Sequence, residues 1–319
     1  MPPNEFAEDG RNALIFGFAF GEGVQGVDVG EQQIAYKTMK KMILGIIALV
    51  VLSMSFNKEH DFTVFMIGDS TMANKDTTGG KQERGWGMVL QQYFDNHVVV
   101  DNHAVNGRSS KSFINEGRWD KVLAKIKPGD YVFIQFGHND EKPQPERHTD
   151  PGSTFDDNLR KFVNDTRSKG GIPVLFNAVV RRNFALKVQK NDDDEKLRNL
   201  DAKSGNNVLE GDTLYDTHGD YRFSPANVAK EMGVVFIDAN AITHELEQGL
   251  GREASKKLHM IFAPGEHPSL PNGRWDNTHY NIYGANQVAV LLIKAVGDKI
   301  PQIKSHLRLK GDTVPVKKR

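Results

Sequence analysis

The sequence contains no cysteine among its 319 residues. This absence excludes disulfide bonds, thiolate metal sites, a cysteine nucleophile and a lipid anchor on cysteine. An excess of charge of either sign is also missing, since 41 basic side chains balance 41 acidic ones. Without a net basic face, we expect no nucleic acid among the partners. The apolar content of 38% suits a globular protein that relies on its core alone.

A hydrophobic run long enough to span a bilayer is absent as well. The apolar segment from Met42 to Val51 is shorter than the ~18–20 residues that a spanning helix needs. It follows Met39-Lys40-Lys41 and precedes Leu52-Ser53-Met54-Ser55, which is the order of a basic n-region, an h-region and a small-residue cleavage site. The alternative is a buried strand or helix. The lysines favour a signal peptide over 39–55, and hence a secreted or periplasmic protein. Because the apolar run is short, we expect no stable membrane span.

This interpretation divides the chain. Translation would begin at Met39, and residues 1–38 would be an upstream extension outside the fold. The mature protein would begin near Phe56 and form a single domain over 56–319. A polar stretch at about 186–221, with an acidic run at 192–195, predicts an insertion that is either a solvated loop or a wall of the substrate cleft.

Short apolar runs alternate with amphipathic stretches along this domain. The stretches have helical spacing at 86–94, 155–163 and 285–296, and Asn281 is a candidate N-cap for the last. Such alternation predicts a parallel sheet covered on both faces, with ligands binding beyond the carboxyl ends of the strands. The expected strands are Thr63–Ile67, Val98–Val100, Tyr131–Gln135, Ile172–Phe176 and Val234–Ile237.

Ser70 lies in a turn at the end of the first of these runs. Gly68-Asp69-Ser70 stops the apolar run, and a serine at the start of a following helix would have free backbone N–H groups beside it. Alone, the tripeptide is also ordinary turn composition. It becomes informative only if the chain supplies a base, an orienting acid and an oxyanion hole.

Three further clusters follow expected strands or precede the last helix. They are Asn106-Gly107-Arg108-Ser109-Ser110, Gly137-His138-Asn139-Asp140 and Asp276-Asn277-Thr278-His279. In a turn or a first helical turn, the spacing of Asp276 and His279 brings a carboxylate to an imidazole. The aspartate would fix the histidine tautomer, so that the other ring nitrogen could take the proton of the Ser70 hydroxyl. The Ser70 and Gly107 amides and the Asn139 side chain could then stabilise an oxyanion.

Each cluster has a structural alternative. Asp276 and His279 could cap the last helix, Gly107 could be an ordinary turn glycine, and Asn139 could form a local turn. A divalent metal is a further alternative, with His138, Asp140, Asp276 and His279 as ligands, although their spacing matches no compact site. Four clusters in this order favour the catalytic interpretation.

These blocks resemble those of the SGNH, or GDSL-like, hydrolases. More narrowly, the chain is similar to the rhamnogalacturonan acetylesterases over about 62–300. The segments that carry this similarity include 102–110, Val179-Val180-Arg181-Arg182, 264–268 and 276–285. The resemblance implies a flavodoxin-like α/β fold, a three-layer α/β/α sandwich with a five-stranded, mainly parallel sheet. It also implies Ser70 as nucleophile, His279 as base and Asp276 as its orienter, with Ser70, Gly107 and Asn139 as the oxyanion hole. The implied reaction removes acetyl groups from pectic polysaccharide and needs no cofactor.

The residues that hold the sugar are harder to assign. Trp275 adjoins Asp276 and offers a stacking face, whereas Trp86 and Trp119 are expected in the core. Either Arg181 or Arg182 could pair with a galacturonate carboxylate, and an internal salt bridge is an equal alternative. The same triad would also serve an acetylxylan esterase, a lipase or a thioesterase. A non-catalytic carbohydrate-binding protein is the alternative of another class, and the sequence leaves the oligomeric state unknown.

Overall fold

The computed structural model describes residues 29–54, 60–184 and 211–309. The chain divides into two units, Met1–Lys58 and Glu59–Arg319. The described part of the first unit is the helix α1 (Val29–Met54), which includes the predicted start at Met39 and most of the predicted signal peptide. No helix in the described residues has both the length and the apolar character of a membrane span. The predicted cleavage site after residue 55, most of the upstream extension and most of the insertion lie outside the described residues.

The second unit is built around a five-stranded sheet in which every neighbouring pair is parallel. The strand order is β3-β1-β4-β5-β6, so the first strand lies in the interior of the sheet between β3 and β4. All five strands match runs that the sequence predicts. They are β1 (Phe62–Gly68), β3 (Val98–Asn102), β4 (Tyr131–Gln135), β5 (Ile172–Phe176) and β6 (Val235–Ile237).

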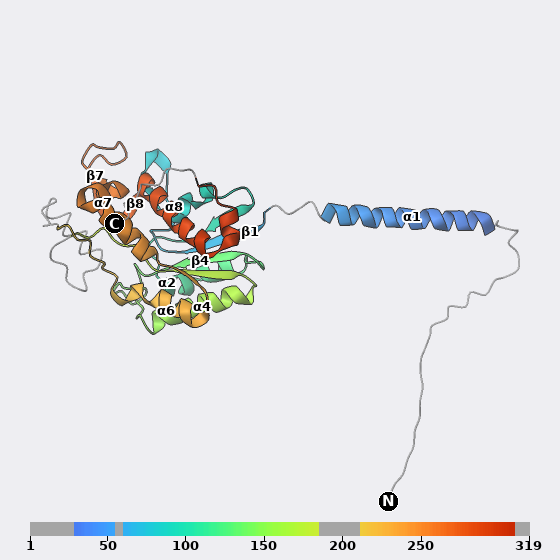
Figure 1. Ribbon diagram of the computed structural model, residues 1–319, viewed down its shortest axis with the longest axis horizontal. Coiled ribbons are helices and arrows are strands. Elements are labelled where there is room, and N and C mark those ends of the chain that lie inside the picture. Colours follow the sequence, from blue (N-terminus) through green and yellow to red (C-terminus); the bar gives the residue numbers. More distant parts are fainter. Residues whose placement is uncertain (1–28, 55–59, 185–210, 310–319) are drawn as a thin grey trace, which may run out of the picture. The chain divides into compact units, whose positions relative to one another are not determined.

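Helices cover both faces of this sheet, which confirms the predicted three-layer α/β/α sandwich (Figure 1). Alternate residues of β1 point to opposite faces, because successive side chains of a strand do so. One layer consists of α7 (Ala239–Ser255), α8 (Ile282–Lys299), α9 (Pro301–Ser305) and the 3₁₀ helices η2 (Trp86–Tyr93) and η4 (Lys256–Leu258). The other consists of α2 (Ser110–Asn115), α3 (Arg118–Leu123), α4 (Thr154–Ser168) and α6 (Ser224–Met232).

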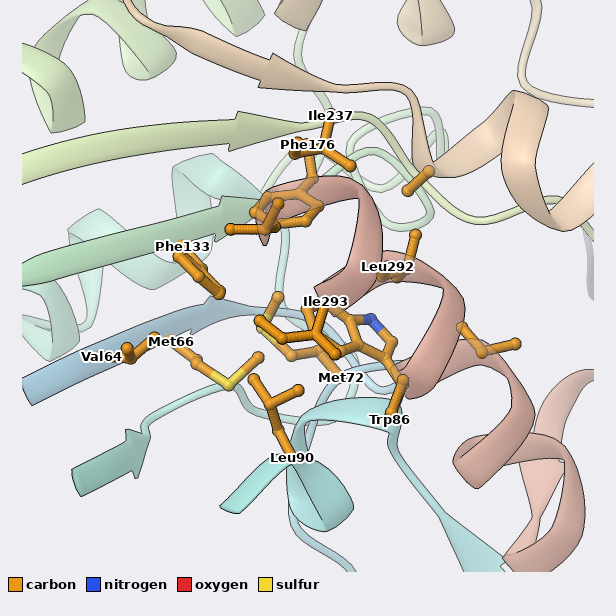
Figure 2. Close-up of a cluster of buried hydrophobic side chains, with 14 of the residues drawn as sticks. Val64, Met66, Met72, Trp86, Leu90, Phe133, Phe176, Ile237, Leu292 and Ile293 are labelled. Atoms are coloured by element: carbon orange, nitrogen blue, oxygen red, sulfur yellow. The ribbon is translucent and has the colours of Figure 1, made fainter. Parts of the chain in front are cut away.

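The core between the sheet and α8 is tightly filled by large side chains. Figure 2 shows Leu292 and Ile293 of α8 among Met66 and Phe133 of the sheet and Trp86 of η2. Each of these five side chains is at most 1% exposed. Full burial of one such side chain contributes roughly 1.5–3 kcal/mol, so this layer holds the sheet in place beneath the loops at its edge.

The helix predictions are confirmed for 155–163 and 285–296, and Asn281 caps α8 by accepting a hydrogen bond from the Gly284 N–H at 2.9 Å. The stretch 86–94 is helical as well, but η2 is a 3₁₀ helix rather than an α-helix. Two further 3₁₀ turns, η1 (Thr78–Gly80) and η3 (Gly219–Arg222), lie in connecting segments.

A second, antiparallel sheet that the sequence analysis did not predict lies beside the first. It has the order β2-β8-β7, with β2 (Glu83–Arg84), β7 (His259–Phe262) and β8 (Arg274–Asn281). The pairing of β7 with β8 shifts register, because consecutive residues His259 and Met260 face Tyr280 and Asp276. Residues 277–279 therefore bulge out of the ladder, and this bulge carries the candidate catalytic histidine.

Candidate active site

Ser70 stands just beyond the carboxyl end of β1, in a turn that only glycine can begin. A Cβ on Gly68 would lie 2.6 Å from the carbonyl oxygen of Gln135 on β4, so the close approach of the two strands requires its absence. The buried Asp69 then holds the turn, since its Oδ1 accepts hydrogen bonds from the N–H of Thr71 at 2.9 Å and from its hydroxyl at 2.8 Å. Ser70 itself is partly exposed.

The core supports this turn from below. The indole Nε1–H of Trp86 donates to Gln135 Oε1 at 2.7 Å, and Gln135 Nε2 donates to Thr71 Oγ1 at 2.8 Å. Because all three residues are buried, these bonds hold Thr71, the residue that follows Ser70, in place. Trp86 is thus a core residue, as expected, and Trp119 is likewise fully buried.

A hydrogen-bonded series joins Ser70 to the bulge of β8. Ser70 Oγ lies 2.8 Å from His279 Nε2, and His279 Nδ1 lies 2.9 Å from Asp276 Oδ2. An ionised carboxylate only accepts, so Nδ1 carries the hydrogen and Nε2 accepts the serine hydroxyl. This is the arrangement in which a serine becomes a nucleophile and a histidine its base.

The bulge also explains how residues three apart in a strand can meet. Asp276 Oδ1 accepts from the backbone N–H groups of Thr278 and His279, both at 3.0 Å, which curls the chain back on its own side chain. Arg182 donates from Nη1 to Asn277 Oδ1 at 3.1 Å and from its backbone N–H to the Asn277 carbonyl at 2.9 Å. The sequence prediction of a turn holds for the geometry, although the turn interrupts a strand instead of opening a helix.

Asp276 is a buried carboxylate whose two oxygens are both well supplied with donors. Besides the bulge N–H groups and His279, Arg274 Nη2 donates to Oδ2 at 2.7 Å. Burial alone would raise the pKa of Asp276, but His279, Arg274 and the backbone donors together hold it well below its ordinary value. Asp276 is therefore ionised at neutral pH and stabilises an imidazolium at His279.

This pKa shift predicts a stability difference that depends on pH. The unfolded chain takes up a proton at Asp276 near its ordinary pKa of about 4, whereas the folded chain does so only at lower pH. The ion pair therefore stabilises the fold above about pH 4, and this contribution is lost as the pH falls through the depressed folded-state pKa. In urea titrations, we expect the gap in unfolding free energy between wild type and Asp276→Asn to shrink below about pH 4. A gap that widens at low pH would contradict the shift.

The candidate oxyanion donors come from three neighbouring strand ends. Ser70 follows β1, Gly107 follows β3 and Asn139 follows β4, and these strands are adjacent in the sheet. Within the described residues, the backbone N–H groups of Ser70 and Gly107 donate to no protein atom. Gly107 has a φ of +74°, a left-handed conformation that favours glycine, and Asn139 Nδ2 lies 3.2 Å from the Arg108 carbonyl oxygen. All three donors are thus candidates for one oxyanion.

Replacement of Asn139 by alanine should slow catalysis without unfolding the protein. The variant loses one side-chain donor to the oxyanion, and loss of one such donor typically costs about 10²–10³ in kcat. We expect that fall in kcat, with KM little changed, for hydrolysis of a short acyl ester. Equal rates for the variant and wild type would remove Asn139 from the oxyanion hole.

Asp140 is an organising residue that the sequence analysis considered only as a metal ligand. Its buried carboxylate accepts from the Ser110 N–H at 3.0 Å, from the Gly137 N–H at 3.1 Å and from the Thr149 hydroxyl at 3.1 Å. Burial raises the pKa of Asp140 to about 7, although the hydrogen bonds from Ser110 and Thr149 oppose the shift. Asp140 thereby ties the loop that carries Gly107 to the loop that carries Asn139. Within the described parts of the chain, no group of three or more His, Asp or Glu side chains could hold a metal ion.

Both arginines proposed for substrate contact lie in the interior. Arg181 is 1% exposed and pairs with Glu141 and with the Thr217 hydroxyl, the latter at 2.8 Å. Arg182 is fully buried, and its Nε donates to Ser255 Oγ at 3.1 Å. Arg181 therefore forms an internal salt bridge with Glu141, the alternative that the sequence left open. Arg182 instead holds the bulge of β8 through Asn277. Neither arginine is therefore part of the proposed substrate site.

Trp275 remains a prediction for sugar contact. It lies on β8 next to Asp276, is partly exposed, and has the Lys256 Nζ at 5.2 Å from its ring centroid. Three residues that sequence reasoning missed also lie beside the site: Lys75, Glu83 and Arg274. They are separated by up to 199 positions, so only the fold brings them together.

Comparisons with known proteins agree with this fold and identify the family. Residues 66–270 match the model of the GDSL-like lipase/acylhydrolase family, a range that includes Ser70, Gly107 and Asn139. The chain is 38% identical to rhamnogalacturonan acetylesterase RhgT of Bacillus subtilis (strain 168) over 244 residues, which cover 76% of this chain and 93% of that protein. It is 31% identical to the probable rhamnogalacturonan acetylesterase YesY of the same organism, over 73% of this chain and 91% of that one.

A solved structure supports the fold alone. The crystal structure of the protein YxiM from Bacillus subtilis superposes with a TM-score of 0.58 at 23% identity, and the match covers 75% of this chain. The chain spans 57% of the length of that structure. The family match covers more than half of the sequence, and the two rhamnogalacturonan acetylesterase relatives, 38% and 31% identical, are covered over 93% and 91% of their length. The protein is therefore a carboxylic ester hydrolase that belongs to the GDSL-like lipase/acylhydrolase family.

Proposed function

We propose that this protein is a secreted serine esterase that removes acetyl groups from pectic polysaccharide of the rhamnogalacturonan type. The observation that carries the catalytic part is the series from Ser70 Oγ through His279 to Asp276, with contacts of 2.8 and 2.9 Å. The naming of two relatives as rhamnogalacturonan acetylesterases, one of them as probable, supports the substrate class. The signal-peptide pattern at 39–55 supports export, which suits a polymer that does not enter the cell intact.

The first half of the reaction transfers the acetyl group to the enzyme. Ser70 Oγ attacks the acetyl carbonyl carbon while His279 Nε2 takes its proton, and Asp276 stabilises the imidazolium. The carbonyl oxygen becomes an oxyanion that accepts from the Ser70 and Gly107 N–H groups and from Asn139 Nδ2. The intermediate collapses, His279 returns the proton to the sugar oxygen, and the sugar hydroxyl leaves an acetyl-enzyme behind.

The second half repeats these steps with water. The oxygen of a water molecule attacks the acetyl-Ser70 carbonyl carbon while His279 takes a proton from that water. The same donors stabilise the oxyanion that forms. Collapse breaks the bond to Ser70 Oγ, which recovers its proton from the imidazolium. Acetate and the original enzyme result, so the cycle needs no cofactor.

The substrate class is tested by acetate release from three esters. We expect kcat/KM to be highest for acetylated rhamnogalacturonan, lower for acetylated xylan and lowest for a long-chain fatty acyl ester. A preference for xylan or for the long acyl chain would replace the pectic assignment and leave the esterase mechanism intact. Glycan binding with no hydrolysis of any short acyl ester would contradict catalysis altogether.

Export is tested separately by N-terminal sequencing of the protein recovered outside the cytoplasm. We expect a mature N-terminus near Phe56. A retained N-terminus before Met39 would contradict both the signal peptide and the start at that methionine.

A further inference from the structure

We propose that Glu83 is a positioning residue that joins the acid of the catalytic series to the loop of the oxyanion hole. It does so through one cation on each side, Arg274 toward Asp276 and Lys75 toward Asn106. The inference rests on the proposed esterase function and assigns new roles around the same site. Glu83, Lys75 and Arg274 all lie outside the sequence blocks that define the catalytic groups.

The first arm runs from Glu83 to the catalytic carboxylate. Glu83 Oε2 accepts from Arg274 Nη1 at 2.7 Å, and Arg274 Nη2 donates to Asp276 Oδ2 at 2.7 Å. The oxygen that Arg274 contacts is the one that accepts from His279 Nδ1. A guanidinium presents its donors in a fixed planar fork, so anchoring one nitrogen on Glu83 also sets where the other meets Asp276.

The second arm runs from Glu83 to the loop after β3. Glu83 Oε1 lies 2.7 Å from Lys75 Nζ, and the same Nζ lies 2.6 Å from Asn106 Oδ1. The Lys75 side chain is only 4% exposed, although it carries a charge. Burial lowers the pKa of Lys75, while Glu83 opposes that shift. Asn106 directly precedes Gly107, so the ammonium holds the residue next to a candidate oxyanion donor.

Glu83 is the only group among these that serves both arms, and its environment favours its charge. Burial would raise the pKa of Glu83, but the positive charges of His279, Lys75 and Arg274 bring it down to about 2. Charge interactions are mutual, so the ionised Glu83 in turn stabilises an imidazolium at His279. The carboxylate thus acts on the reaction in two ways, by geometry and by charge.

Two variants test this role with opposite expected signs. Glu83→Gln removes a negative charge near His279, so the acidic limb of the pH profile of kcat/KM should move to lower pH. Lys75→Met removes a positive charge from the same series, so the limb should move to higher pH. For each, we expect kcat on 4-nitrophenyl acetate to fall about 10- to 100-fold with KM nearly unchanged, because misplaced groups cost roughly that much.

The double variant and a distant control complete the experiment. If the two residues act as one series, the loss in Glu83→Gln combined with Lys75→Met should be smaller than the product of the single losses. Glu231→Gln is the matched control, because Glu231 pairs with Arg160 at 2.8 Å between exposed parts of α4 and α6. It should leave both rate and pH profile unchanged.

The outcomes separate this proposal from the proposed function. A wild-type protein with no activity on 4-nitrophenyl acetate would refute the esterase assignment itself. An active wild type with rates and acidic limbs unchanged in both variants would overturn the role of Glu83 alone. Acidic limbs that shift in the same direction in both variants would also overturn it. The two variants remove charges of opposite sign, so an effect of charge must shift the limbs in opposite directions, whereas a purely structural disturbance need not. If Glu83→Gln does not fold, the acidic limb of the Lys75→Met pH profile tests the proposal alone. A shift of that limb to higher pH supports the proposal, and an unchanged limb or a shift to lower pH overturns it.

Discussion

Replacing Ser70 with alanine is expected to lower kcat for acetyl ester hydrolysis by about 10⁶-fold, the scale seen when a serine nucleophile of this kind is removed. The variant keeps the candidate oxyanion donors and His279 but has no oxygen to form the acetyl-enzyme. Replacing His279 with alanine in the same variant should add little, because the two side chains act as one unit. Acetate release followed over hours, with enzyme at high concentration, measures the residual rate.

Ser168→Ala is the matched control for that loss. Ser168 is an exposed serine at the end of α4, and among the described residues its hydroxyl bonds only to the Asp165 carbonyl, at 2.6 Å. It should retain the wild-type rate. A loss of less than tenfold in Ser70→Ala would show that the hydrolysis does not depend on this hydroxyl.

Asp276→Asn is expected to lower kcat by about 10⁴-fold while the fold persists at neutral pH. The amide that replaces the carboxylate carries an N–H₂ group, and four donors from His279, Arg274 and the bulge backbone converge on this position. An amide offers one acceptor oxygen, so His279 no longer has a fixed tautomer with Nε2 free to accept. KM should change little, because Asp276 is only 2% exposed and its carboxylate contacts His279.

Asp157→Asn provides the comparison for this second variant. Asp157 pairs with Arg160 at 2.8 Å on α4, and its side chain is 71% exposed. A surface pair of this kind contributes little, so rate and stability should both stay at the wild-type level. A fall in kcat of less than tenfold in Asp276→Asn would contradict the role assigned to the carboxylate.

The sheet and the placement of Ser70, Gly107 and Asn139 could be predicted because their signals are local. Continuous apolar runs marked the five parallel strands, and polar clusters directly after three of them had to meet at one sheet edge. The strand β8 could not be predicted in the same way. Its sequence, from Arg274 to Asn281, is mostly polar, and it becomes a strand by pairing with β7 and β2.

The directions of individual side chains were the other limit. The position of Arg181 and Arg182 after β5 placed them at the ligand edge, but it did not show that both guanidinium groups turn inward to buried partners. The contacts of Glu83 with Lys75 and Arg274 join segments that no short-range pattern links. Such contacts depend on how the second sheet docks beside the first, and that information lies in the tertiary packing.

The central claim is that Ser70 becomes covalently acylated with His279 as its base. The most direct measurement uses an aryl phosphonate ester that transfers phosphorus to an activated serine, followed by mass spectrometry of the peptides. We expect one label per molecule, on Ser70, with inactivation in step with labelling and almost no label on the His279→Ala variant. A fully inactivated enzyme labelled on another residue, or an enzyme that keeps its activity with Ser70 labelled, would contradict it.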